Sequence, residues 1–212
     1  SNIGADFGAV FKKGTGFKYK EIINQYNENG EYIQNAISKE FIMKVQNTLS
    51  KNDTTIVFLN KFFDAEIFKN SVSPSVLIFT KDACYIGQSG KSWPFNSDAD
   101  ISTLNIDSLI NKYFDLLIYK NQKYNRADNF EDSINYPFLV STEEMNVIKL
   151  QNQTIKTAIY NFKVSTSHST LKYKYSNDLG FIEYDFEYGS GVAMDGKFIL
   201  IDIKKLPDET KD

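Results

Sequence analysis

The feature that most restricts the fold of this 212-residue chain is a strict alternation of apolar and acidic residues near its end. Residues 181–188 read Phe-Ile-Glu-Tyr-Asp-Phe-Glu-Tyr. Successive side chains of a strand point to opposite faces, so this stretch predicts a strand with one buried and one solvated face. Related patterns recur over residues 155–206, which favours an antiparallel sheet. We therefore interpret the three acidic residues as a solvated face and not as a catalytic carboxylate pair.

Strand patterns also run through the rest of the chain. They predict strands at 17–26, 31–37, 40–46, 55–62, 75–80, 83–88, 147–150, 155–167, 170–176, 181–188 and 196–205. Residues 27–30, Asn-Glu-Asn-Gly, predict a hairpin because Asn and Gly accept positive φ angles. At 106–117 the apolar spacing becomes helical, and Asn105 is placed to cap the first turn. We expect a mainly β fold: a strongly curved antiparallel sheet or half-barrel of roughly eight to ten strands, with one amphipathic helix.

Length and composition define the expected domain organisation. A chain of this size can bury a core without disulfides, and one domain is the simplest expectation. We assign residues 1–8 to a linker or cloning remainder, 9–207 to a single β-rich domain and 208–212 to a frayed, charged tail. The polar stretch 120–133 is the expected exposed connection.

Charge and residue usage narrow the functional classes. The 24 basic and 27 acidic residues give a formal charge of −3, and Arg126 is the only arginine. We therefore expect no nucleic acid partner. Cys84 and His168 are the only residues of their types, so the sequence offers no disulfide, no Cys-rich zinc site and no two-histidine metal centre. We expect Cys84 to be a buried apolar residue, and we expect no metal and no cofactor.

One catalytic alternative remains open. His168 lies in a hydroxyl-rich run, Ser-Thr-Ser-His-Ser-Thr, at 165–170. A serine or threonine nucleophile needs a nearby base, and His168 is the only histidine able to serve as one. Hydroxyl clusters are also ordinary turn chemistry, which is the interpretation that we favour.

The aromatic residues suggest a ligand site. The chain has 17 Phe and 13 Tyr, and Tyr173 and Tyr175 share one face of a predicted strand, as Tyr184 and Phe186 do on the next. The turn between these strands pairs them, so all four rings are predicted to point to the same side. With Trp93 in a covering loop, they are our candidate residues for binding a hydrophobic ligand. The alternative is that the rings fill the core.

Three stretches carry a resemblance to a known family. They are residues 11–19, Phe-Lys-Lys-Gly-Thr-Gly-Phe-Lys-Tyr, residues 154–160, Thr-Ile-Lys-Thr-Ala-Ile-Tyr, and residues 173–184, Tyr-Lys-Tyr-Ser-Asn-Asp-Leu-Gly-Phe-Ile-Glu-Tyr. They resemble exported β-rich lipoprotein domains of Gram-negative envelopes, mostly of unknown function and remotely similar to the LolA/LolB-like fold of lipoprotein sorting. The resemblance implies a half-barrel, export, and a place in the periplasm or at the outer membrane. It supplies no catalytic residue.

These observations lead to one functional hypothesis and two alternatives. The hypothesis is a non-catalytic cell-envelope domain that binds a hydrophobic small molecule or an envelope protein. Contact with the membrane would come only through a lipid anchor on a cysteine outside this sequence. The alternatives are a hydrolase that uses His168 with a nearby hydroxyl, and a structural or adhesion module.

Overall fold

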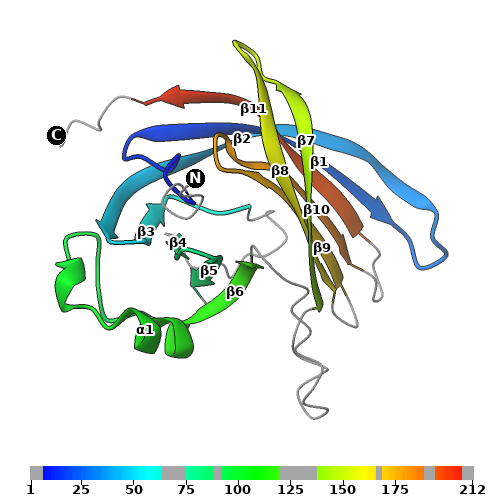
Figure 1. The fold of residues 1–212 in the computed structure, drawn as a ribbon. Helices are drawn as coiled ribbons and strands as arrows, with labels where there is room; N and C mark the ends of the chain where they lie inside the picture. Colours follow the sequence, from blue (N-terminus) through cyan, green and yellow to red (C-terminus); the bar gives the residue numbers. More distant parts are fainter. Residues whose placement is uncertain are drawn as a thin grey trace, which may run out of the picture. The chain divides into compact units, whose positions relative to one another are not determined.

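The computed structural model of the protein describes residues 7–63, 75–87, 92–119, 138–165, 169–188 and 194–206 (Figure 1). Its strands are β1 (Thr15–Tyr26), β2 (Tyr32–Lys51), β3 (Thr54–Leu59), β4 (Ser75–Phe79), β5 (Ala83–Gly87), β6 (Phe114–Tyr119), β7 (Phe138–Lys149), β8 (Thr154–Ser165), β9 (Ser169–Ser176), β10 (Gly180–Tyr188) and β11 (Met194–Lys205). The described helices are the 3-10 helix η1 (Ile101–Thr103) and the α-helix α1 (Ile106–Tyr113). Neither of these helices has the length and apolar character needed to cross a membrane.

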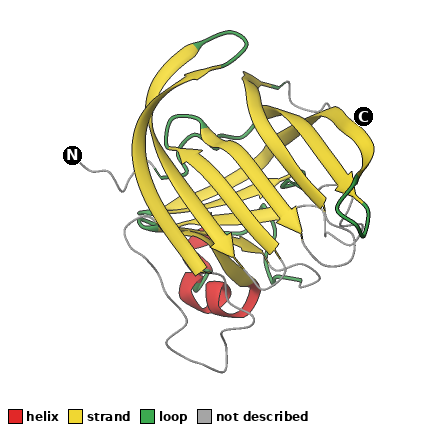
Figure 2. Cartoon of the chain, turned by 90° about the vertical axis from the view of Figure 1, so that its right-hand side faces the viewer, coloured by secondary structure: helices red, strands yellow, loops and turns green. Residues whose placement is uncertain are grey.

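The strands form a sheet in the order β6-β5-β4-β3-β2-β1-β11-β10-β9-β8-β7. Neighbours such as β7 and β8, β9 and β10, and β10 and β11 pair antiparallel. The expected mainly β, antiparallel class with one α-helix is confirmed (Figure 2). The strand count was wrong: the described residues form eleven strands, not eight to ten. The expected strands at 31–37 and 40–46 are one continuous β2, and β6 was not foreseen.

The helix prediction was correct at its start and wrong at its end. Asn105 caps α1 as expected, its Oδ1 accepting a hydrogen bond from the Ser108 amide at 3.1 Å. The helix stops at Tyr113 because Phe114 already has extended angles, φ −124° and ψ 148°. Residues 114–117, which continue the helical spacing, instead begin β6 and pair with β5. A short apolar run is compatible with a helix or with a strand. Here the pairing of this segment with β5 makes it a strand.

The turn predictions hold at the first hairpin. Gly30 has φ +77°, and Asn27 Oδ1 accepts hydrogen bonds from the amides of Asn29 and Glu31. These are the local bonds for which Asn is favoured in turns.

Contacts group the chain into two compact units. The first unit comprises Ser1–Phe17, Met43–Tyr119 and Lys204–Asp212, and the second comprises Lys18–Ile42 and Lys120–Ile203. The strands β1, β2 and β11 each contribute residues to both units. A single domain over 9–207 stays a prediction, and the connection at 120–133 lies outside the described residues.

In the first unit, the sheet packs apolar residues on both faces. On one face Ile56, Phe58, Val76, Ile78 and Phe114 form a buried cluster. The partly buried residues packed on it come from α1, from the loop before it and from strands: Leu49, Tyr85, Trp93, Phe95, Ile101, Leu104, Ile106, Ile110 and Tyr113. The apolar stripe of α1 therefore faces the sheet, as predicted.

Phe7 and Phe11 pack against Phe79 of the first unit, with ring centroids 5.3 and 5.1 Å apart. Gly8, at φ +91°, lies against this ring, and a Cβ there would be 2.6 Å from a ring carbon of Phe79. Phe7 is 3% exposed, so the packed part of the chain begins before the expected linker ends at residue 8.

In the second unit, the two faces of the sheet differ in chemistry. The register pairs Tyr160 with Tyr175 and Phe162 with Tyr173, so aromatic side chains share one face. The same register pairs Asn161 with Lys174 and Lys163 with Lys172 on the opposite face. This is the alternation that the sequence predicted, extended over several strands.

The turn between β9 and β10 is held by buried hydroxyl groups. Gly180 has φ +74°, and the Asp178 amide donates to Ser176 Oγ at 3.0 Å. Ser176 and Thr157 are buried, with their hydroxyl oxygens 2.6 Å apart, and Thr157 Oγ1 donates to Asp178 Oδ2 at 2.7 Å. The side chains of Ser176, Asp178 and Thr157 thus bond to one another between the turn and the neighbouring strand β8. Asn177 Oδ1, in the same turn, is buried with no hydrogen-bond partner among the described residues.

Candidate functional site

The structure brings the four candidate residues of β9 and β10, three tyrosines and one phenylalanine, together on one face. Tyr173 stacks on Tyr184 with centroids 4.8 Å apart, and Tyr184 contacts Phe186 at 5.9 Å. Tyr175 contacts Phe181 at 5.1 Å. The predicted common orientation of these rings is therefore observed. We call the buried rings of β8 to β11 the ring cluster: Tyr160, Phe162, Tyr173, Tyr175, Phe181, Tyr184, Phe186 and Phe198.

The ring cluster is packed tightly. Its members are between 0 and 7% exposed, and Tyr175 is fully buried. Burial, with smaller effects of Tyr173 and Tyr188, raises the pKa of Tyr184 well above its ordinary value. Gly196 of β11 pairs with Phe186, and a Cβ at Gly196 would be 2.3 Å from the Phe186 ring. The rings thus fill the space against one another, which is how aromatic residues build a core. The role of Tyr173, Tyr175, Tyr184 and Phe186 in binding a ligand stays a prediction.

A bulge in β10 recruits a ring that simple alternation does not predict. The register between β9 and β10 shifts between Phe181 and Glu183. As a result Phe181 pairs with Tyr175 while Tyr184 pairs with Tyr173. An extra residue in one strand changes which side chains share a face.

Trp93, the fifth candidate, belongs to the first unit. Its ring stacks on Phe114 with centroids 5.9 Å apart. It also lies over Gly87, where a Cβ would be 2.5 Å from the indole. In the first unit Trp93 therefore packs on the face that α1 covers, and a role in covering a ligand stays a prediction.

The opposite face of the second unit carries two adjoining grooves. The larger, of about 430 Å³, is lined by Asn161, Phe162, Lys163, Tyr173, Lys174 and Glu183 beside three shared residues. The smaller, of about 330 Å³, includes Asn24, Thr170, Glu187 and Asp195 beside the same three. The shared residues are Lys172, Asp185 and Lys197. We call this surface the charged face, since lysines and carboxylates of β8 to β11 make up half of the residues that line the two grooves.

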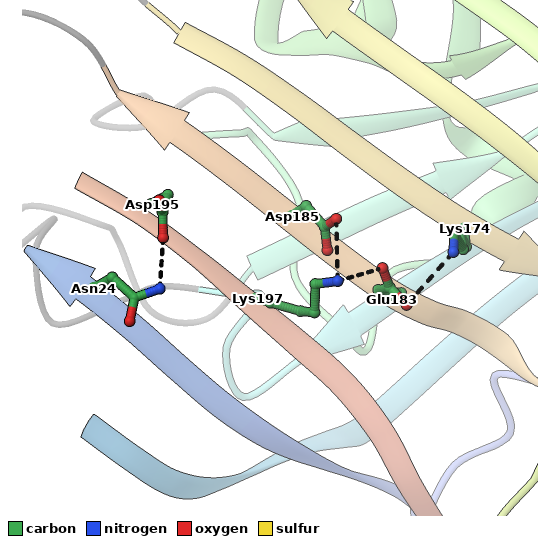
Figure 3. Close-up of polar contacts among 6 residues, drawn as sticks. All are labelled: Asn24, Lys174, Glu183, Asp185, Asp195 and Lys197. Atoms are coloured by element: carbon green, nitrogen blue, oxygen red, sulfur yellow. Dashed lines mark hydrogen bonds and ion pairs between the residues drawn. The ribbon is translucent and has the colours of Figure 1, made fainter. Parts of the chain in front are cut away.

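Ion pairs across β9, β10 and β11 organise the charged face (Figure 3). Lys197 Nζ lies 3.2 Å from Glu183 Oε1 and 3.7 Å from Asp185 Oδ2. Lys174 Nζ lies 3.6 Å from Glu183 Oε2. The positions follow from the register, which pairs Asp185 with Lys197 of β11 and with Lys172 of β9. The side chains of Glu183 and Asp185 are only 17% and 30% exposed, so the expected solvated face is partly buried.

Asp185 is the most perturbed group of this face. Burial, and then the neighbouring charge of Glu183, raise its pKa from 3.8 to about 6, while Lys197 acts in the opposite sense. Its Oδ1 atom is buried and has no hydrogen-bond partner among the residues that the structure describes. A carboxylate that is costly to keep charged and that lies in a groove is typical of a functional position.

The end of the smaller groove is held by hydrogen bonds to Asp195. Asn24 Nδ2 donates to Asp195 Oδ1 at 2.7 Å, as Figure 3 shows, and the Tyr26 hydroxyl donates to Asp195 Oδ2 at 3.0 Å. Strands β1 and β11 are thereby linked through side chains at this end. Unlike Asp185, Asp195 has both carboxylate oxygens bonded.

Cys84, His168 and clusters of metal-ligating side chains are the other candidates for chemistry. Cys84 is fully buried, and burial raises its thiol pKa well above the ordinary value, so it is the apolar core residue that we expected. His168 lies outside the described residues, and the hydrolase alternative stays a prediction. Within the described ranges, no three His, Cys, Asp or Glu side chains are grouped so as to hold a metal ion.

Sequence reasoning missed the charged face as a site. Glu183 and Asp185 were noticed, but their lysine partners were not. The available signal is that Lys172, Lys174 and Lys197 each occupy the polar phase of a strand that neighbours β10. Recognising that these lysines meet the carboxylates of β10 requires the register between the strands, which cannot be derived from one strand's sequence at a time.

Comparisons with known proteins give remote structural neighbours. No family model and no curated protein matches the sequence. An exported protein with a YmcC-like fold from Bacteroides fragilis matches with a TM-score of 0.41 and 12% identity, over 92% of this chain and 97% of that one. A LolA superfamily protein from Nitrosomonas europaea matches with a TM-score of 0.27 and 12% identity, over 98% and 93%. The resemblance noted in the sequence thus agrees with the descriptions of these neighbours. At such values neither carries an argument about function.

Proposed function

We propose that this protein is a non-catalytic binding protein of the cell envelope, and that it recognises a protein partner through the charged face. The observation that carries the proposal is the contrast between the two faces of the second unit. The rings of the ring cluster are buried, whereas the charged face has two adjoining open grooves that share Asp185. The exported setting is the one that the sequence resemblance implies.

The form of the grooves favours a protein over a small molecule. Small-molecule sites are concave and enclose most of the ligand surface. Here the two grooves adjoin along β8 to β11 and are open, so they suit a broad or extended partner. Two of their lysines are paired with carboxylates: Lys197 with Glu183 and Asp185, and Lys174 with Glu183. Fixed charges of both signs contribute to specificity and to the rate of encounter.

Asp185 defines what the partner offers. Its Oδ1 is buried with no bonding partner among the described residues, and its pKa is raised to about 6. A lysine, an arginine or an amide of the partner that approaches the partly exposed carboxylate of Asp185 would stabilise its charged form. In the free protein the charged, partly buried carboxylate lowers stability, and a donor from the partner would remove that loss.

Site-directed photo-cross-linking in the native cell envelope tests the proposal. A benzophenone amino acid replaces Lys172, which lies in both grooves, and the matched control replaces Lys156, an exposed lysine of β8 that lines neither. We expect a discrete protein adduct from position 172 alone, lost when Lys197→Glu is added. No adduct, or the same adducts from both positions, contradicts the proposal.

A hydrophobic ligand at Tyr173, Tyr175, Tyr184 and Phe186 is the second candidate. It is supported by the unbroken series of ring contacts, which extends through Phe198 to Phe41 at 5.5 Å. An environment-sensitive apolar dye should then bind the native protein, and Tyr175→Ala should weaken dye binding. A native protein that does not bind the dye eliminates this candidate.

A further inference from the structure

Strand β7 is an exposed edge with apolar side chains. Among the strands that the structure describes, it stands at the end of the order, with β8 as its neighbour over residues 138–149. Residues 144–147 are all exposed, and Met145 and Val147, which share one face of the strand, are 62% and 51% exposed. An edge of this kind offers its free backbone groups and its apolar side chains to another strand.

A hydrogen bond at this edge marks a donor that β8 does not use. The backbone amide of Val147 donates to Oδ1 of Asn146, its own neighbour in the strand, at 2.8 Å. An amide directed at β8 would donate to a carbonyl of that strand. The Val147 amide therefore faces the free edge, where the Asn146 side chain occupies it.

We infer that β7 pairs antiparallel with β7 of a second copy of this chain, about a two-fold axis at Asn146. In this register Met145 lies opposite Val147 of the second copy, and the reverse pair is formed on the other side of the axis. Position 143, a glutamate, lies opposite Lys149. Each copy thus covers the exposed apolar residues of the other and pairs opposite charges twice.

The neighbouring registers are less favourable. Directly opposite residues must face the same side of the sheet, so the axis has to pass through a residue that lies opposite itself. An axis at Glu144 places two glutamates opposite each other. An axis at Met145 places position 143, a glutamate, opposite Val147 and leaves Lys149 opposite Ser141. The axis at Asn146 is the one among these three that pairs opposite charges.

A disulfide scan tests this register directly. Directly opposite residues of antiparallel strands have Cα atoms about 4.5–5.5 Å apart, within the range of a disulfide. Asn146→Cys should therefore cross-link two copies under mild oxidation, whereas Glu144→Cys, displaced from its own counterpart by about 13 Å along the strand, should not. Cys84 is buried and does not interfere. Equal cross-linking at both positions, or none at position 146, overturns the inference.

Charge reversal gives a second, independent test. Sedimentation of the unmodified chain should show a concentration-dependent dimer, and a monomer at all concentrations overturns the inference. Glu143→Lys and Lys149→Glu should each weaken this dimer roughly tenfold by creating two like-charge pairs. Mixing the two variants restores both opposite-charge pairs, so the mixture should dimerise more tightly than either alone. A mixture that gains nothing overturns the register, and circular dichroism confirms that each variant folds. This contact does not involve the charged face, so the proposed function and the dimer fail separately.

Discussion

The two units differ in the side chains that cover the faces of their strands. In the first unit, both faces of the sheet carry packed apolar residues: α1 with its preceding loop on one, and Phe7 and Phe11 against Phe79 on the other. In the second unit, one face carries the ring cluster and the other carries paired charges and two grooves. A sheet covered on both faces serves stability. A sheet that keeps partly buried charges on one face gives up stability there, which points to binding.

The largest expected effect is in the ring cluster. Tyr175→Ala should lower the free energy of unfolding by about 3–5 kcal/mol, as other aromatic truncations in a core do, because Tyr175 is fully buried against Phe181. Urea denaturation measures this loss. Tyr32→Ala, at a tyrosine that is 49% exposed, is the matched control and should cost under about 1 kcal/mol. Similar small losses for both variants would mean that the rings line an open site, which would revive the hydrophobic-ligand candidate.

The next effect is in the first unit, at the helix that covers its sheet. Leu109 is 7% exposed and lies on the apolar stripe of α1. Leu109→Ala should cost about 2 kcal/mol, the low end for such truncations, because a two-turn helix can move into the space. Asn111→Ala, at an exposed position of the same helix, should cost little. If the two variants unfold alike, α1 does not contribute to the core and the contrast between the units fails.

Local signals in the sequence were sufficient for part of this fold. Asn105 and the run at 27–30 act through hydrogen bonds to their own neighbours, so the helix start and the first hairpin could be read directly. Alternation likewise gave the two faces of β10. Strand β6 was not predicted from the sequence, because helical spacing continues from α1 into residues 114–117. Only the pairing with β5 distinguishes a strand from a longer helix there.

Predicting the candidate site would have required the register between neighbouring strands. The bulge near Ile182 leaves the alternation of the sequence intact, yet it moves Phe181 into the ring cluster. The charged face requires Lys172, Asp185 and Lys197 to be in register across three strands. Register is set by the turns and by packing of the whole sheet, so one strand at a time does not reveal it.

The smallest expected effect is the pH dependence due to Asp185. Burial and the charge of Glu183 raise its pKa from 3.8 to about 6, against the opposing effect of Lys197. The folded state therefore binds this proton more tightly than the unfolded state does. From about pH 4 until the pH has passed the folded-state pKa of about 6, the folded state holds more protons, so this group makes stability fall as the pH rises, and the loss levels off about one pH unit above that pKa.

Asp185→Asn removes that titration, so the stability of the unmodified protein relative to the variant should decrease from about pH 4 through pH 6 and level off at about pH 7. Melting temperatures across this range measure the trend. Glu187→Gln is the control, since it removes an exposed carboxylate from the same strand and the same face. The stability of this variant relative to Asp185→Asn should still decrease over the same pH range, as that of the unmodified protein does. A flat difference between the unmodified protein and Asp185→Asn would show that water solvates Asp185 fully, and the energetic reason for a partner at the charged face would disappear.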